Sequence, residues 1–187
     1  MRRTAAISLT ALVAVLLGAS AVQAELGLKA IEARVGFTDL EGAAGSTFIV
    51  SGGVDMGKLT PDIGLEFGVD FWTKSWGEGF FDASTTNIGF LANVRYNFRM
   101  EGTIHPFAFA GASLHYFSSS ASCDGCGWLG ENVDNSDSEI DFGANFGAGA
   151  EFGSGGSMVP LVRGGYNING GMNYIFIQGG LKFFMGK

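Results

Sequence analysis

Long apolar runs are missing from the chain after its first 24 residues. The longest candidate, PFAFAGASLHYF, starts at Pro106 and ends in a run of serines. A helix that spans a membrane needs about 20 consecutive, mostly apolar residues. The sequence therefore argues against a helical membrane protein.

Basic residues are also scarce. The 187 residues include 11 Lys and Arg against 18 Asp and Glu, which gives a formal net charge of −7, and the basic residues form no cluster. Proteins that bind nucleic acid usually present clustered Lys and Arg to the phosphates. No nucleic-acid partner is expected.

The first 24 residues read MRRTAAISLTALVAVLLGASAVQA. They combine two arginines, a short apolar run and the small-residue pattern Val22-Gln23-Ala24. This order is typical of a secretory signal peptide that is cleaved after its last alanine. We predict a signal peptide over residues 1–24 and one exported domain over residues 25–187.

Cysteine and histidine are too few for most metal or redox sites, with two of each in the chain. Cys123 and Cys126 form a C-x-x-C motif, and in an exported protein the first interpretation is a disulfide that pins a loop tip. A zinc site would need two further ligands nearby, and a thioredoxin-like motif would need a βαβ context. The acidic residues around the motif lack the spacing of an EF-hand. We therefore predict the disulfide, no metal and no cofactor.

Apolar residues alternate strictly in EIDFGANFGAGAEF, residues 139–152. The even positions are all apolar, whereas the odd positions are acidic residues, glycine or asparagine. Side chains of a strand alternate between two faces, whereas a helix would scatter these residues around its surface. The stretch is predicted to be a strand with one apolar and one polar face.

The same alternation recurs in eight segments of about ten residues, the length that a tilted strand needs to cross a bilayer. The segments are residues 28–40, 47–57, 63–74, 87–99, 106–117, 140–153, 160–168 and 174–184. Short turns alternate with longer loops, of which 75–86 and 118–139 are the longest. We predict an all-β fold, an eight-stranded antiparallel up-and-down transmembrane β-barrel.

The polar face of these segments carries glycine between isolated charges. A surface that faces water would be richer in Lys, Glu and Thr, whereas the narrow lumen of an eight-stranded barrel needs small residues beside long ones. Buried charges are tolerated when they pair. The charges predicted to face inward as a lumen network are nearly balanced: Glu32, Asp55, Glu66, Asp70, Asp141 and Glu151 with Arg34, Arg95, Arg99, Arg163 and Lys182. A soluble, lipocalin-like barrel with its apolar face inward is the alternative.

These features resemble the small outer-membrane β-barrel family of Gram-negative bacteria that includes opacity, OmpX-like and OmpA-barrel proteins. The resemblance rests on the signal peptide, the eight alternating segments, HPFAFAGASL from His105, FGANFGAGAEF and the closing YIFIQGGLKFF. It implies a porin-like protein of the outer membrane, inserted by the barrel assembly machinery, with both termini in the periplasm. Loops 75–86 and 118–139 would then lie at the cell surface. Family members commonly end at an aromatic residue, whereas here Met185, Gly186 and Lys187 follow Phe184.

The functional hypothesis is a monomeric structural or surface-interaction protein. It would contact outer-membrane lipids and meet an extracellular partner through loops 75–86 and 118–139. A narrow barrel that binds or transports small hydrophobic solutes is the alternative, and a lipid-modifying enzyme is a more distant one. Because Ser113 and His115 lie two residues apart without a third catalytic partner, we predict no enzyme and no catalytic residue.

Overall fold

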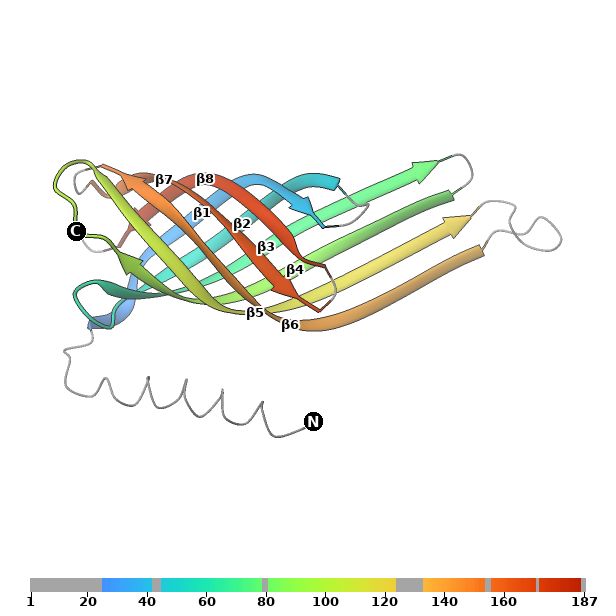
Figure 1. Cartoon of the computed structure of the whole chain (residues 1–187), viewed down its shortest axis with the longest axis horizontal. Coiled ribbons are helices and arrows are strands. Elements are labelled where there is room, and N and C mark those ends of the chain that lie inside the picture. Colours follow the sequence, from blue (N-terminus) through green and yellow to red (C-terminus); the bar gives the residue numbers. More distant parts are fainter. Residues whose placement is uncertain are drawn as a thin grey trace, which may run out of the picture.

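Eight antiparallel strands close into one barrel in the computed structural model, which describes residues 25–41, 45–78, 81–123, 133–153, 156–170 and 172–185 (Figure 1). Each strand pairs with its sequence neighbours, and β1 pairs with β8 to complete the ring. The strands are β1 (Glu25–Leu40), β2 (Gly45–Lys58), β3 (Ile63–Glu78), β4 (Phe81–Asn97), β5 (Ile104–Cys123), β6 (Val133–Phe152), β7 (Met158–Asn169) and β8 (Tyr174–Phe184). The predicted fold class is confirmed. The described residues contain no helix that is long and apolar enough to cross a membrane.

The alternation read from the sequence matches the two faces of the barrel wall. In β6, the apolar side chains of Ile140 and Phe142 point outward and are 62% and 82% exposed, whereas Asn145 and Glu151 are buried in the lumen. A wall that exposes apolar side chains outward and buries charges inward is the reverse of a soluble barrel. The soluble, lipocalin-like alternative is therefore wrong.

The two ends of the barrel differ in height. We call the end where β1 begins and β8 ends the terminal end, and the opposite end the distal end. At the distal end β5 and β6 have 20 residues each, whereas β7 and β8 have 12 and 11. Figure 1 shows β3 to β6 extending beyond the other four strands.

This extension is a four-stranded sheet that we call the projecting sheet. It consists of residues 73–78 of β3, 81–86 of β4, 118–123 of β5 and 133–138 of β6. The ladder between β2 and β3 ends at the pair Ile49 and Trp72, and the ladder between β6 and β7 ends at Gly143 and Asn169. The projecting sheet therefore has two lateral edges, unlike the closed barrel below it.

The prediction that 75–86 and 118–139 are loops is wrong for most of both segments. Residues 75–78, 81–86, 118–123 and 133–139 are strand, and only residues 79–80 and 124–132 lie outside the described residues. These segments are rich in Ser, Thr, Asn and Asp on both faces, so they lack the apolar alternation that was used to recognise strands. Main-chain pairing continues there because it does not depend on an apolar face.

Candidate functional site

An ion-pair network fills the lumen toward the terminal end. It consists of four carboxylates and four cations that the sequence predicted to face inward: Glu32, Asp55, Glu66 and Glu151 with Arg34, Arg95, Arg163 and Lys182. Lys182 Nζ lies 2.6 Å from Asp55, 3.0 Å from Glu151 and 3.4 Å from Glu32. One ammonium group therefore links carboxylates from three strands.

Arginine side chains of the network also stack on aromatic rings. Arg95 lies 2.7 Å from Glu151 and 3.7 Å from the centroid of the Phe107 ring. Arg163 lies 2.8 Å from Glu66 and 3.8 Å from the centroid of the Phe109 ring. Each guanidinium thus meets a carboxylate and the negative face of a ring, which stabilise a buried cation together.

Glycines of β6 make room for these rings. A Cβ atom on Gly147 would lie 2.2 Å from the carbonyl oxygen of Gly164 and 2.5 Å from Cζ of Phe109. A Cβ atom on Gly149 would lie 2.4 Å from the carbonyl oxygen of Val162 and 2.5 Å from Cζ of Phe107. Because real Cβ atoms do not approach this closely, both positions require glycine. The sequence interpretation attributed the space to neighbouring charges, whereas the structure places the aromatic rings there.

Neutral polar groups complete the contacts of the network. Asn93 Nδ2 donates a 3.0 Å hydrogen bond to Oε1 of Glu66. Buried ions are tolerated when a partner of opposite charge and hydrogen bonds replace the lost water. The equal numbers of cations and carboxylates meet this requirement.

Aromatic side chains close the lumen on the distal side of the network. The Trp72 ring lies 6.0 Å from the rings of Phe117 and Tyr174, and the Tyr174 ring lies 6.3 Å from Phe176. His115 stacks on Phe117 at 5.8 Å and shares a 3.0 Å hydrogen bond with Asn87 through Nδ1. These side chains are nearly or fully buried, and they lie in the lumen together with the buried charges of the ion-pair network.

Sequence reasoning found only part of this aromatic layer. The inward positions of Phe107, Phe109 and Phe117 were missed because the predicted fifth strand carries small or apolar residues on both faces. The charges of the neighbouring strands are the signal that could have set its phase. Arg95, which faces inward on β4, pairs with Phe109 of β5, so Phe109 faces inward as well.

Three of the predicted network residues do not join it. Asp70 and Asp141 have no ion pair within 4 Å among the described residues, although Asp70 is buried and belongs to the inward face of β3. Arg99 was predicted to face the lumen, and this is wrong. It lies beyond the end of β4 with a side chain that is 73% exposed, and it pairs at 2.5 Å with Asp62 in the neighbouring turn. The alternation was extended past the residue where the chain leaves the sheet.

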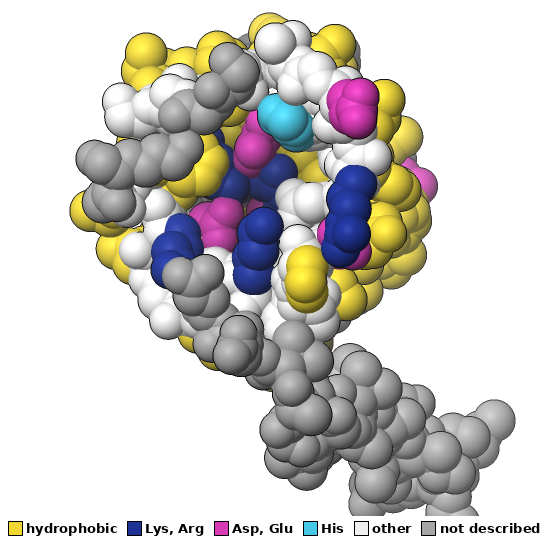
Figure 2. Space-filling model, turned by 90° about the vertical axis from the view of Figure 1, so that its left-hand side faces the viewer, with side chains coloured by type: hydrophobic (Ala, Val, Ile, Leu, Met, Phe, Trp, Pro, Cys, Tyr) yellow, Lys and Arg dark blue, Asp and Glu magenta, His cyan; other side chains and the backbone are white. Residues whose placement is uncertain are grey.

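The terminal end of the lumen opens as a shallow mouth. Figure 2 views this end and shows basic and acidic side chains inside a ring of hydrophobic exterior. The mouth holds about 260 Å³, and its lining includes Asp55, Glu66, Arg95, Glu151 and Lys182. Because these residues belong to the ion-pair network, the mouth ends at the filled part of the lumen.

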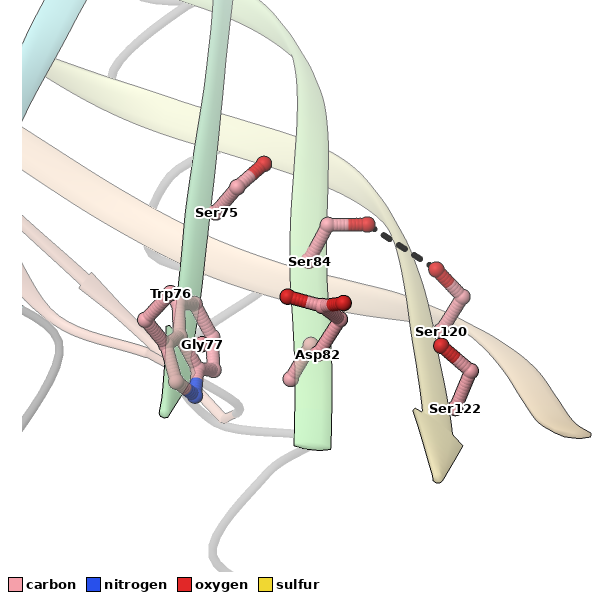
Figure 3. Close-up of a pocket in the computed structure, with 8 residues that line it drawn as sticks. Ser75, Trp76, Gly77, Asp82, Ser84, Ser120 and Ser122 are labelled. Carbon is pink, nitrogen blue, oxygen red and sulfur yellow. Dashed lines mark hydrogen bonds between the residues drawn. The ribbon is translucent and has the colours of Figure 1, made fainter. Parts of the chain in front are cut away.

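A second hollow, of about 480 Å³, lies on the projecting sheet (Figure 3). Figure 3 shows hydroxyl and carboxylate groups from three strands, with a 2.9 Å hydrogen bond between Ser84 and Ser120. The lining residues are Ser75, Trp76, Gly77, Asp82, Ala83, Ser84, Ser120 and Ser122. Thr73 and Thr86 form a similar cross-strand pair at 3.1 Å, so hydroxyl pairs tie the strands together above the barrel.

On the side of the barrel away from the projecting sheet, the distal rim contains a cluster of hydrogen bonds around Glu41, which follows β1. Tyr166 donates a hydrogen bond to one carboxylate oxygen of Glu41, and Asn173 donates a 2.9 Å hydrogen bond to the other. These two hydrogen bonds, chiefly that of Tyr166, hold the pKa of the Glu41 carboxyl below its usual range.

The comparisons with known proteins agree with this architecture. A sequence model of the family described as "Outer membrane protein beta-barrel domain" matches residues 6–175. A search among curated protein sequences returned no match.

Three solved structures have a similar fold. Neisserial surface protein A (NspA) is 19% identical with a TM-score of 0.53, and the alignment covers 83% of this chain and 96% of that one. The N-terminal barrel of Pseudomonas aeruginosa OprF is 14% identical with a TM-score of 0.55, covering 85% and 99%. Ail of Yersinia pestis is 13% identical with a TM-score of 0.54, covering 85% and 100%. At these identities the likeness concerns the fold alone. Because the family model spans most of the chain, the protein belongs to the outer membrane protein beta-barrel domain family and resides in the cell outer membrane.

Proposed function

We propose that this outer-membrane barrel is a structural or surface-interaction protein whose lumen is filled by side chains and whose outward contacts are made by the projecting sheet. The observation that carries the proposal is that buried charged and aromatic side chains lie in the lumen while four strands extend beyond the barrel. Such a protein can bind a partner through the projecting sheet, whereas solutes have no open channel through the barrel.

The filled lumen supports this proposal over solute transport. Eight strands leave an interior that side chains can fill. Here the ion-pair network occupies the terminal half, and Trp72, Phe117 and Tyr174 occupy the distal half with exposed fractions of 7% or less. A small hydrophobic solute would have to displace one of these layers.

The orientation follows from the chemistry of the two ends. The projecting sheet is rich in Ser, Thr, Asn and Asp and therefore belongs in water. Short terminal-end turns and a long distal extension are the usual arrangement of outer-membrane barrels, with the longer side outside the cell. We place the termini in the periplasm and the projecting sheet at the cell surface, in a monomer that is inserted by the barrel assembly machinery.

The charge of the projecting sheet sets the class of partner. A structure of Ail was solved with the heparin analogue sucrose octasulfate, a highly anionic ligand. The projecting sheet here presents Asp82 and Asp137, with Glu139 beside it, and Lys74 is its one basic residue among the described positions. Anionic ligands are repelled by such a surface. The partner that we propose is therefore neutral or basic.

The arrangement of the polar lumen residues supports a protein that is not an enzyme. Ser113 Oγ lies 3.5 Å from Asn167, and His115 Nδ1 shares a hydrogen bond with Asn87, so neither of these hydrogen bonds joins the serine to the histidine. A serine nucleophile would need a base within hydrogen-bond reach and an opening to substrate. Both residues are buried, at 4% and 0% exposure.

Two predictions concern residues that the structure does not describe. The signal peptide over residues 1–24 lies outside the described residues, so the division into 1–24 and 25–187 stays a prediction. Cys123 ends β5 at the tip of the projecting sheet, whereas Cys126 also lies outside the described residues. We propose that the disulfide closes the hairpin between β5 and β6.

The proposal is tested by conductance and by attachment. The refolded barrel in planar lipid bilayers is expected to give no steady ion conductance. Expressed in a non-adherent Gram-negative host, the full chain is expected to increase retention of cells on surfaces coated with extracellular-matrix proteins.

A shortened variant provides the control. Replacing residues 119–137 by a tight Asn-Gly turn removes the β5–β6 part of the projecting sheet and leaves the barrel ladders. Retention is expected to fall to the level of the host while the variant still shows the heat-modifiable gel mobility of a folded barrel. Steady conductance of the full chain, or equal retention of both chains, would overturn the proposal.

A further inference from the structure

Two apolar grooves lie side by side on the outward face of the barrel wall. The first holds about 440 Å³ and runs across β1 to β4. Its walls are the outward side chains of Ile31, Val54, Phe67, Val69 and Phe90, and Gly52 lies in its floor. All its walls are hydrocarbon.

The second groove holds about 280 Å³ and runs across β3 to β6. Its floor contains Ala92 and Ala112, and its far wall is Leu114 and Phe142. Phe67 and Phe90 line both grooves, so these two rings form a ridge that separates them.

The grooves exist because small residues stand where large ones would fill the wall. Gly52 pairs with Val69, and Ala92 pairs with Ala112, in rows of otherwise large outward residues. A Cβ atom built on Gly52 would meet only the carbonyl oxygen of Glu32, at 4.0 Å. Neither the backbone conformation nor packing requires glycine at position 52. A larger side chain would fit there and would fill the groove, so the groove is a feature that needs an explanation.

The membrane determines what can occupy the grooves. Their residues lie near the middle of the apolar band, between polar Thr73 and the terminal-end turns, so they face the hydrocarbon core of the outer membrane. Glu32 is the one charged residue that touches the first groove, and its side chain is buried in the lumen network. Ser113 lines the second groove, but its hydroxyl donates a hydrogen bond to Asn167 in the lumen. The outward side chains that line the two grooves are therefore apolar and do not bind a lipid headgroup, whereas a void without contacting atoms loses dispersion energy.

We propose that the two grooves form a binding site for one phospholipid, whose two acyl chains lie on either side of the Phe67–Phe90 ridge. Lipid association with a barrel wall depends on close packing, because surrounding lipid is as apolar as the protein surface. A chain that fills a groove gains contacts that it cannot make on a smooth wall. The bound lipid is therefore expected to exchange more slowly than its neighbours.

Photo-crosslinking tests this site directly. The refolded chain is placed in nanodiscs of phosphatidylethanolamine and phosphatidylglycerol that contain a phospholipid with a diazirine in the middle of both acyl chains. After irradiation, adducts are mapped by mass spectrometry of peptides. We expect adducts on the groove peptides of β2 to β5 to exceed those on outward residues of β7 and β8 by at least about threefold.

Three variants separate groove filling from general effects. Gly52→Leu is expected to reduce adducts in the first groove at least about threefold, and Ala112→Leu to do the same in the second. Gly179→Leu is the matched control, because Gly179 also faces outward on a strand and a Cβ atom there would meet only Leu161 O at 4.0 Å. It is expected to leave the adduct pattern unchanged.

Each other outcome overturns the site as proposed. Even labelling around the barrel would show that the grooves do not select lipid. Labelling of one groove alone would exclude a lipid that straddles the ridge, and protein–protein crosslinks through the grooves would identify a second copy of the chain as the occupant. If a leucine variant fails to fold, Phe90→Ala tests the same site by removing the ridge, and unchanged adducts in that variant would contradict the proposal.

Discussion

Arg163 on β7 donates a 2.8 Å hydrogen bond to Glu66 on β3, across the full diameter of the barrel. The two residues are 97 positions apart in the sequence and are both buried. Every strand except β5 contributes a charge to the ion pairs of the lumen, in which Arg163 and Glu66 form one pair and the other six charges form a cluster. Strand β5 contributes the rings on which Arg95 and Arg163 stack. The pair therefore joins opposite walls directly, beyond the strand-to-strand ladders that close the ring.

Removing one member of this pair is expected to destabilise the barrel strongly. Glu66→Gln keeps the size of the side chain and a hydrogen-bond partner for Asn93, but it leaves Arg163 without its nearest carboxylate. An uncompensated buried charge costs about 3–5 kcal/mol in the free energy of unfolding. Urea unfolding of the refolded protein in lipid vesicles, followed by tryptophan fluorescence, measures the change.

The double variant Glu66→Gln with Arg163→Met is the control for charge balance. It removes one carboxylate and one cation, so the network returns to equal numbers. It is expected to recover most of the stability that Glu66→Gln loses, because a buried ion pair contributes little net stability relative to uncharged side chains. A double variant less stable than either single variant would contradict the balance argument.

The sequence was sufficient to predict the barrel, and eight of the eleven charges that it assigned to the lumen form ion pairs there. Strict alternation sets both the strand and its two faces, since a shift of one residue would move every side chain to the other face. This is why Glu151 could be placed in the lumen from a pattern of glycine and phenylalanine alone. The partners of each charge could not be predicted, because pairs such as Lys182 and Asp55 depend on the register of non-neighbouring strands.

The projecting sheet could not be predicted for a different physical reason. Alternation reports contact with an apolar phase, whereas residues 119–120 and 135–138 are exposed on both faces of their strands. Hydroxyl pairs such as Thr85 and Ser119, 3.0 Å apart, leave no periodic signal in hydropathy. The alternation also gave no sign of where β4 ends. For this reason Arg99, which lies beyond the end of β4, was predicted to face the lumen.

Gly149→Ala is expected to destabilise the barrel by overpacking. The added Cβ atom would lie 2.4 Å from the carbonyl oxygen of Val162 and 2.5 Å from Phe107 Cζ, and the ring is held from the other side by Arg95. Overpacking of a filled interior costs about 1–3 kcal/mol. The same urea titration measures it, with Gly179→Ala as the matched control on the open outward face. Equal stability of the two variants would show that the side chains around Gly149 can move to accommodate the added methyl group, and would contradict the prediction.

Arg95→Met and Arg99→Met are expected to differ sharply, although the two arginines are four residues apart. Arg95 is buried and contacts Glu151 and Phe107, so its loss leaves excess negative charge in the lumen and should cost about 3 kcal/mol or more. Arg99 pairs with Asp62 in water, where an exposed ion pair contributes little. Urea midpoints of the two variants, measured beside the parent protein, test this difference. A larger loss for Arg99→Met would restore that residue to a structural role in the barrel.

Tyr166→Phe is expected to raise the pKa of Glu41 toward its ordinary value of 4.5. The hydrogen bond from Tyr166 is the main cause of the lowered pKa, and it favours the charged carboxylate of the folded protein. The stabilisation from this carboxylate is therefore complete above pH 4.5 and is lost as the pH falls through the lowered pKa. A carboxyl-carbon NMR titration of the protein in detergent micelles measures the pKa directly. Tyr116→Phe, which removes another outward tyrosine hydroxyl on β5, is the control and should leave Glu41 unchanged. If Tyr166→Phe leaves the titration of Glu41 where it was, the rim contact does not form in the folded protein.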